Sequence, residues 1–271
     1  MHSIHALILG VVQGITEFFP ISSSGHLLAF HDLLHFDQSD SLTFDASLHL
    51  GTMLALVAYF WKDIIQLFKD FFRSLAHWNI QQDPGQHQVW TVIVGAIPAG
   101  VVGVFADKWF EGHVRNLWVV VISLVIGSIV FWVTEAWLRK QQTKDTVSFK
   151  AAWVVGFAQI IALVPGISRS GATIIGAFTQ KLDRKTAARF AFLVSIPVVA
   201  GAGLLKLKDL LQARPTSGEL TDVIIGIVAA TVVGYMVIHF FLRFVQKHSL
   251  SVFAWYRVIA AALLAIYLIA R

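Results

Sequence analysis

The sequence contains no cysteine at any of its 271 positions. That absence excludes disulfide frameworks, thiolate nucleophiles and zinc sites built on cysteine. Charge is also scarce, because only 14% of the residues are Asp, Glu, Lys or Arg, against roughly a quarter in ordinary soluble domains. A soluble protein needs polar side chains to cover its surface, so we expect lipid to cover much of this one.

Hydrophobic residues make up 56% of the chain, and the mean hydropathy is +0.70. The net charge of +5 raises the question of nucleic acid. The basic residues, however, lie in short connectors between apolar runs, and no basic face is interleaved with aromatic residues. Membrane proteins show that pattern under the positive-inside rule. The composition therefore predicts a membrane bilayer, and no nucleic acid, as partner.

Six apolar stretches are long enough, at about 20 residues each, to cross ~30 Å of hydrocarbon. They are residues 43–62, 89–108, 116–137, 186–206, 221–243 and 251–270. The apolar stretch from Ile4 to Ile15 has no Lys or Arg ahead of it and no small-residue cleavage site. We therefore expect mature protein there and no signal peptide.

Two further apolar segments, 4–36 and 151–181, are interrupted in the middle. The first interruption reads FFPISSSGH at 18–26, and the second reads VPGISRSG at 164–171. Pro and Gly stop a helix, and Ser is a good N-cap for the next one. Each segment therefore predicts a re-entrant helix–loop–helix hairpin, since irregular backbone at membrane depth survives only in protein or beside a wet cavity.

The two interrupted segments match each other at a constant shift of 146 residues, and a second match lies downstream at a shift of 131. The first match pairs Gly10, Gln13, Ile21, Ser22, Ser24 and Gly25 with Gly156, Gln159, Ile167, Ser168, Ser170 and Gly171. Three spans per half is an odd number, so the second half enters the membrane upside-down. We predict one all-α integral membrane domain of two inverted repeats, approximately 1–140 and 150–271.

The distribution of Lys and Arg predicts the orientation of these spans. Six of them fall on one side of the membrane and 14 on the other, with Arg257 counted in the larger set. The richer side is expected to be cytoplasmic, which places the N-terminus outside.

Ionisable residues inside membrane segments are costly and mark function. Glu17, His26 and Arg169 lie in or beside the two interruptions. A helix N-terminus attracts anions, and an Arg fork suits phosphate oxygens. Two such loops facing each other predict a site for a phosphorylated group at membrane depth. The expected binding residues are Gln13, Ser22, Ser168, Ser170, Gly171 and Thr173.

Plainer interpretations stand beside these. The serines could simply cap helices, and Glu17 could pair with Arg169 for architecture alone. Gln13 and Gln159 could bond across the pseudo-twofold axis or line the site. His31, His35 and His49 are expected at interfacial or packing positions.

Residues 13–26 and 165–173 together closely resemble the undecaprenyl pyrophosphate phosphatases, the bacitracin-resistance family. The family motifs are Glu/Gln-x-x-x-Glu, here with Gln13 and Glu17, and Pro-Gly-x-Ser-Arg-Ser-x-x-Thr. The resemblance covers essentially the whole chain. It implies hydrolysis of undecaprenyl pyrophosphate to the monophosphate, which recycles the carrier for peptidoglycan and other envelope polymers. It also implies a divalent cation, Mg²⁺ or Ca²⁺, and a site on the outer face of a bacterial cytoplasmic membrane. Glu17 would either hold this metal or orient the nucleophile.

For such a reaction we expect Glu17, Ser23, His26 and Arg169 to be catalytic. Arg169 and the loop N–H groups would neutralise the phosphoryl charge, which is the larger task in phosphoryl transfer. Ser23 would attack with His26 as its base; direct attack by His26 or by a metal-bound water is the rival. A flippase or transporter of a polyprenyl phosphate or other anionic lipid is the alternative function, and a homodimer is left open.

Overall fold

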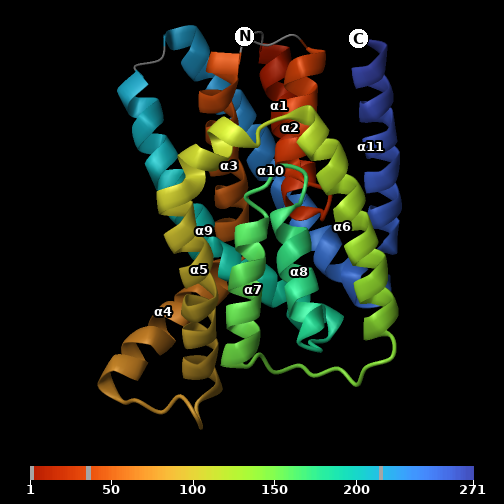
Figure 1. Ribbon diagram of the computed structural model, residues 1–271. Helices are drawn as coiled ribbons and strands as arrows, with labels where there is room; N and C mark the ends of the chain where they lie inside the picture. Colours follow the sequence, from red (N-terminus) through yellow and green to blue (C-terminus); the bar gives the residue numbers. More distant parts are fainter. Residues whose placement is uncertain (1–2, 35–37, 214–215) are drawn as a thin grey trace.

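Two short helical hairpins meet inside a bundle of longer helices (Figure 1). The computed structural model describes residues 3–34, 38–213 and 216–271; side chains are described at 3–34, 44–105, 113–204, 212 and 216–271. Over these residues all the regular elements are helices, eleven in number. This confirms the all-α prediction. His35, which was expected at an interfacial or packing position, lies outside the described residues.

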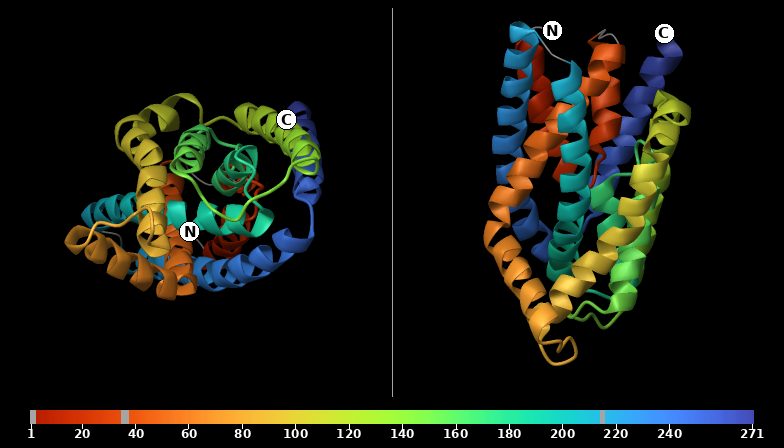
Figure 2. Two further views of the ribbon diagram at one scale, coloured as in Figure 1. Left: turned by 90° about the horizontal axis from the view of Figure 1, so that it is seen from below. Right: turned by 90° about the vertical axis from the view of Figure 1, so that its left-hand side faces the viewer.

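The helices of the two hairpins end where the sequence is interrupted. They are α1 (Ser3–Phe18), α2 (Ser23–Leu33), α7 (Phe149–Ile161) and α8 (Arg169–Thr179). The α1–α2 hairpin enters the bundle from the end that carries both termini, and α7–α8 enters from the opposite end, so that their loops meet in the middle (Figure 1). Seen from below, α7 and α8 lie among the longer helices (Figure 2).

Seven further helices complete the described structure. They are α3 (Gln38–Tyr59), α4 (Trp61–Ala76), α5 (Pro84–His113), α6 (Leu117–Leu138), α9 (Arg184–Ala213), α10 (Ser217–Lys247) and α11 (Ser251–Ala270). Five of them, α5, α6, α9, α10 and α11, hold segments long and apolar enough to cross a membrane. The protein is therefore a multi-pass membrane protein.

The expected span 43–62 does not run straight to its end. The helix stops at Tyr59, and the chain bends by 74° into α4. Charged residues such as Lys62, Asp63 and Lys69 recur in α4. They favour a turn out of the bundle axis because lipid offers them no partner. The bent pair α3 and α4 provides a sixth membrane span only if the two helices are counted as a single span.

Paired glycines bring helix backbones of the two halves together in matching ways. A Cβ atom added at Gly10 would lie 2.6 Å from the carbonyl oxygen of Gly226, and one added at Gly156 would lie 2.5 Å from that of Gly95. Small residues permit such close helix approach in membranes. The shifts of 146 and 131 relate these two contacts to each other. The duplication stays a prediction, which these contacts favour.

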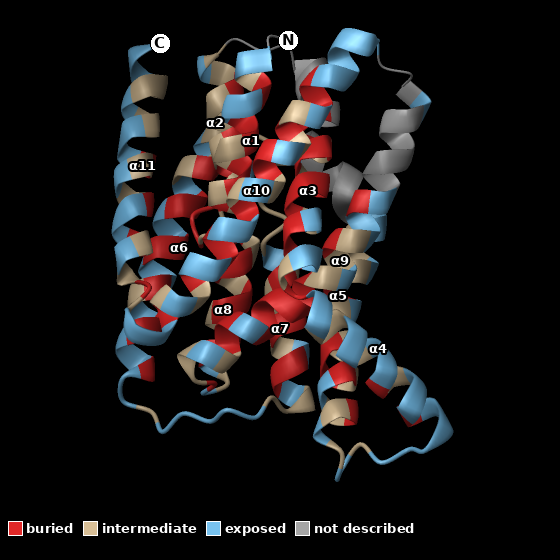
Figure 3. Ribbon diagram, turned by 180° about the vertical axis from the view of Figure 1, so that it is seen from behind, coloured by how far each residue is buried: buried red, intermediate tan, exposed pale blue. Residues whose placement is uncertain are grey.

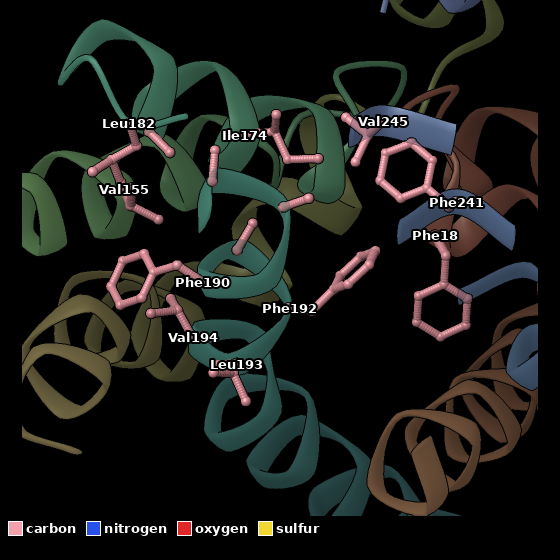
Figure 4. Packing of buried hydrophobic residues seen from close by; sticks show 14 of the residues in the cluster. Phe18, Val155, Ile174, Leu182, Phe190, Phe192, Leu193, Val194, Phe241 and Val245 are labelled. Carbon is pink, nitrogen blue, oxygen red and sulfur yellow. The ribbon is translucent and has the colours of Figure 1, made fainter. Parts of the chain in front are cut away.

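Aromatic side chains fill the core beside the hairpins. The ring of Phe192 lies 5.8 Å from those of both Phe18 and Phe241, edge-on to Phe18, and the three residues belong to one buried cluster (Figure 4). The ribbon of α11 is largely exposed or half-buried instead (Figure 3). The exposed residues of α6 and α11 include the apolar Ile122 and Leu263. Lipid would cover these exposed residues.

Candidate active site

The loop between α1 and α2 (loop 1, residues 19–22) and the loop between α7 and α8 (loop 2, residues 162–168) end in the same way. Ser22 and Ser168 are the N-caps, with φ of 74° and 78°. Each hydroxyl accepts a hydrogen bond from the N–H three residues on, Gly25 at 3.3 Å and Gly171 at 3.2 Å. A left-handed φ is uncommon for serine and tends to occur at functional sites.

The two loops are also bonded to each other. The Ser22 hydroxyl oxygen accepts from the Gly166 N–H at 3.1 Å, and the Ser170 hydroxyl donates to the Phe19 carbonyl at 3.2 Å. Both bonds cross between the halves of the chain. These bonds therefore hold the two loops together at the centre of the bundle.

Glu17, in the last turn of α1, is surrounded by donors. Its side chain is only 8% exposed, and Arg169 Nη2 lies 3.1 Å from Oε1. Ser23 Oγ donates to Oε2 at 2.6 Å, and Gln13 Nε2 donates at 3.0 Å. His49 Nε2 lies 3.7 Å from the same oxygen. The structure thus brings together Gln13, Glu17, Ser23 and Arg169, four of the predicted residues.

A small cavity of about 20 Å³ lies beside this carboxylate. Arg169, whose side chain is 27% exposed, lies on its wall. The residues that line it are Glu17, Phe18, Thr52, Leu56, Arg169, Ser170, Phe192, Ser195 and Val199.

His26 is oriented differently from the expectation. Its Nδ1 lies 2.7 Å from the Ser22 carbonyl oxygen, and its Nε2 lies 2.7 Å from the Tyr256 hydroxyl. Because a carbonyl only accepts, Nδ1 carries the proton, and in the neutral ring Nε2 accepts from Tyr256. Neither nitrogen is hydrogen-bonded to Ser23, whose hydroxyl donates to Glu17. In this geometry the Glu17 carboxylate, and not the His26 ring, accepts the hydrogen bond of the Ser23 hydroxyl.

Two of the remaining predicted binding residues, Gly171 and Thr173, use their polar groups within α8 and its N-cap. The Thr173 hydroxyl is buried and donates to the Arg169 and Ser170 carbonyls within α8. The Gly171 N–H is taken by the Ser168 cap. The N–H groups of Arg169 and Ser170 open α8 without a partner inside the helix, so they are the amides that loop 2 can offer to an anion.

A metal ion at this site would have Glu17 as its carboxylate ligand. Among the described residues no group of three or more His, Cys, Asp or Glu could hold one. Gln13, fully buried, leaves its amide oxygen without a hydrogen-bond partner. One carboxylate and one amide oxygen fit Mg²⁺ or Ca²⁺ only when substrate phosphates complete the coordination, as Mg²⁺ sites often require.

Three residues near the site were missed from the sequence. His49 was expected to be a packing residue, Tyr256 was not considered, and Arg257 was counted among the connector charges. Arg257 instead lies inside α11 with no exposure. Without Arg257 in the count, 13 of the 14 Lys and Arg residues remain on the richer side, so the predicted membrane orientation is unchanged. The cost of ionisable groups inside a membrane would have identified both His49 and Arg257.

Comparison with known proteins identifies the family. A family model described as "Bacitracin resistance protein BacA" matches residues 6–263. A protein named undecaprenyl-diphosphatase from Rubrobacter xylanophilus is 42% identical over 267 residues, covering 98% of each chain. Proteins of the same name from Geotalea daltonii and Geobacter sulfurreducens are 38% and 39% identical, over 99% and 100% of both chains. The chain therefore belongs to the bacitracin resistance protein family, as its two motifs predicted.

Proposed function

We propose that the protein hydrolyses undecaprenyl pyrophosphate to undecaprenyl phosphate and inorganic phosphate, recycling the carrier lipid for cell-wall synthesis. The observation that carries this is the contact of Glu17 with both Arg169 and Ser23 where the two loops meet. The relatives' name, undecaprenyl-diphosphatase, supplies the polyprenyl pyrophosphate as substrate. Nothing in the relatives' names favours the alternative of lipid-phosphate transport.

The groups at the end of loop 2 and the start of α8 bind the pyrophosphate. Arg169 presents its fork to the phosphoryl oxygens, and the first N–H groups of α8 add donors at a positive helix end. Ser170, which lines the cavity, donates its hydroxyl to the Phe19 carbonyl and so supports this helix end. Arg169 and the N–H groups neutralise the charge that spreads over the phosphoryl oxygens during transfer.

Ser23 is the nucleophile that the geometry favours. Its Oγ attacks the terminal phosphorus as its proton passes to Glu17, 2.6 Å away. The bond from Oγ to phosphorus forms, the bridging P–O bond breaks, and undecaprenyl phosphate leaves. Glu17 gives this proton to the leaving undecaprenyl phosphate. Water then attacks the phosphoserine and its proton passes to Glu17; the Oγ–P bond breaks, inorganic phosphate leaves, and Glu17 returns the proton to Ser23 Oγ. Attack by His26 first requires release of the Tyr256 hydroxyl from Nε2.

A divalent cation, Mg²⁺ or Ca²⁺, would be held by Glu17 and the amide oxygen of Gln13 together with the pyrophosphate. Bound there, it would supply further charge neutralisation on the phosphate oxygens. Gln13 keeps its amide directed at Glu17 through the 3.0 Å bond from Nε2, which leaves its oxygen for the cation.

The membrane arrangement that we propose has six spans and two re-entrant hairpins, in a bacterial cytoplasmic membrane with the site accessible from the outer side. The excess of Lys and Arg at the opposite end supports that orientation. A homodimer stays a prediction.

The test is release of phosphate from undecaprenyl pyrophosphate by purified protein in detergent, with and without EDTA, beside Arg169→Ala. Metal-dependent release that vanishes in the variant is expected. Arg243→Ala, which removes an exposed arginine from α10, serves as the matched control. No release by well-folded wild-type protein would contradict the proposal, because a detergent assay has no sides and a pure transporter would convert nothing.

A further inference from the structure

Arg257 lies wholly buried between the two loops. Within the described part of the chain, every hydrogen bond that its guanidinium makes goes to a backbone carbonyl oxygen. The acceptors are Pro20 at 3.2 Å, Ile167 at 2.9 Å, Gly166 at 3.0 Å, Ser123 at 3.1 Å and Leu124 at 3.3 Å. The acceptors belong to loop 1, loop 2 and α6, so one side chain joins all three.

A buried arginine is expensive unless it is paired, and within the described residues no salt bridge includes Arg257. Its partners are dipoles, together with the face of Phe131, whose ring centroid lies 5.5 Å away. The guanidinium is a rigid plane with five donors at fixed angles. It therefore fixes the positions of the carbonyls that it binds, and with them the separation of the loops.

The helix α6 is shaped to receive this guanidinium. A Cβ atom added at Gly127 would lie 1.9 Å from Arg257 Nη2. A glycine is required at this position because any side chain would occupy the place of the guanidinium. Gly127 and Arg257 are thus two residues of one contact, on different helices.

The neighbour of Arg257 also reaches the site. Tyr256 holds His26 through its hydroxyl at 2.7 Å and stacks on its ring at 5.7 Å. Two consecutive residues of α11 therefore contact the N-terminal part of the site. The position that corresponds to Arg257 in the first half, 131 residues earlier, is Ile126. Only one half of the chain supplies this contact.

We propose that Arg257 is a positioning residue: it holds the two loops at the separation at which Ser23, Glu17 and Arg169 surround one phosphoryl group, and it does not touch the substrate itself. This rests on the proposed phosphatase function. The guanidinium reaches loop 1 through Pro20 and loop 2 through Gly166 and Ile167. Those carbonyls precede the caps Ser22 and Ser168, which start α2 and α8.

Two variants test the contact from opposite sides. Arg257→Lys keeps the charge but loses the planar fork, and Gly127→Ala keeps Arg257 but displaces its guanidinium. Because small misplacements of reacting groups cost about 100-fold in rate, kcat is expected to fall about 100-fold in each. KM should stay within about threefold, since the groups that bind phosphate remain. Gly100→Ala, whose added Cβ meets nothing within 4 Å, is the control and should match the wild type.

The double variant separates a shared contact from two unrelated defects. If both substitutions act through the same guanidinium, the double variant should be no more than about threefold slower than the slower single variant. Multiplied losses would overturn the proposal. So would wild-type kcat in folded Gly127→Ala protein, a result that decides the matter even if Arg257→Lys does not fold. A purely structural role would lower Tm while leaving kcat per folded molecule unchanged.

A spectroscopic readout keeps this inference distinct from the phosphatase itself. Because the chain has no cysteine, Ser24→Cys, at an exposed position in the first turn of α2, carries one nitroxide label. We expect a more mobile spectrum in both Arg257→Lys and Gly127→Ala, and the wild-type spectrum in Gly100→Ala. Unchanged spectra in both variants would overturn the positioning role. Absence of phosphate release by wild-type protein would instead overturn the proposed function and leave the spectra to decide the role of Arg257.

Discussion

Ser23 donates its hydroxyl to Glu17 at 2.6 Å, although the two residues lie on different helices of the first hairpin. The turn at Pro20 and the left-handed φ of Ser22 bring the start of α2 back beside the end of α1. A carboxylate and a hydroxyl at that distance are within reach of proton transfer, as the proposed base and nucleophile require. The same carboxylate holds Arg169 from the second hairpin at 3.1 Å, so one side chain joins both halves of the site.

Replacing the charge of Glu17 should stop turnover while leaving the fold intact. Glu17→Gln keeps the shape of the side chain but cannot accept a proton from Ser23, so kcat should fall by about 1,000-fold. Phosphate release per folded molecule measures this. Glu219→Gln, at an exposed position on α10, is the matched control and should behave as wild type. A loss smaller than about tenfold in Glu17→Gln would remove Glu17 as the base.

The nucleophile can be identified from the covalent intermediate. If Ser23 attacks, brief reaction with a pyrophosphate lipid labelled at the terminal phosphate should leave an acid-stable phosphoserine, which Ser23→Ala abolishes. His26→Gln should be slower yet still form it, because His26 Nε2 is bonded to Tyr256 and not to Ser23. An acid-labile label that disappears in His26→Gln and persists in Ser23→Ala would assign the attack to His26. The absence of any label, with steady turnover, would favour water.

The amide at Gln13 should limit how tightly the cation binds. Gln13→Glu places a second carboxylate beside Glu17, and carboxylates are the preferred ligands of Mg²⁺ and Ca²⁺. The Mg²⁺ concentration for half-maximal activity should therefore fall about tenfold, measured by titration after EDTA treatment. Gln88→Glu, exposed on α5, controls for added charge. An unchanged or higher half-maximal concentration would mean that Gln13 does not face the metal.

Glu135 should matter for stability and not for chemistry. Its side chain is 2% exposed, pairs with Arg184 and accepts from the Leu250 N–H at 2.7 Å. Glu135→Ala leaves the Leu250 N–H without its acceptor and removes the ion pair of Arg184, which keeps only the His248 carbonyl at 3.3 Å. This should cost about 2 kcal/mol in the free energy of unfolding. Tm in detergent should drop while kcat of the folded fraction stays the same. A parallel loss of kcat at unchanged Tm would contradict this assignment.

The sequence by itself determined the membrane class, both interruptions and three of the central residues. Long apolar runs can be stable only in lipid, and Glu17, His26 and Arg169 stood out because charge inside such runs is costly. The two motifs were sufficient to predict the family. These features are local, since each depends on residues close together in the chain.

Tertiary structure decided which groups touch. The backbone turn at Ser22 sends the Ser23 hydroxyl to Glu17 and the His26 ring to Tyr256, 230 residues away. From the sequence, Arg257 was counted as one of the connector charges. Its partners are carbonyl oxygens, which every residue has and which no sequence motif reveals. Only the packing of α11 against the two loops makes that arginine part of the site, because the fit of its guanidinium depends on three segments at once.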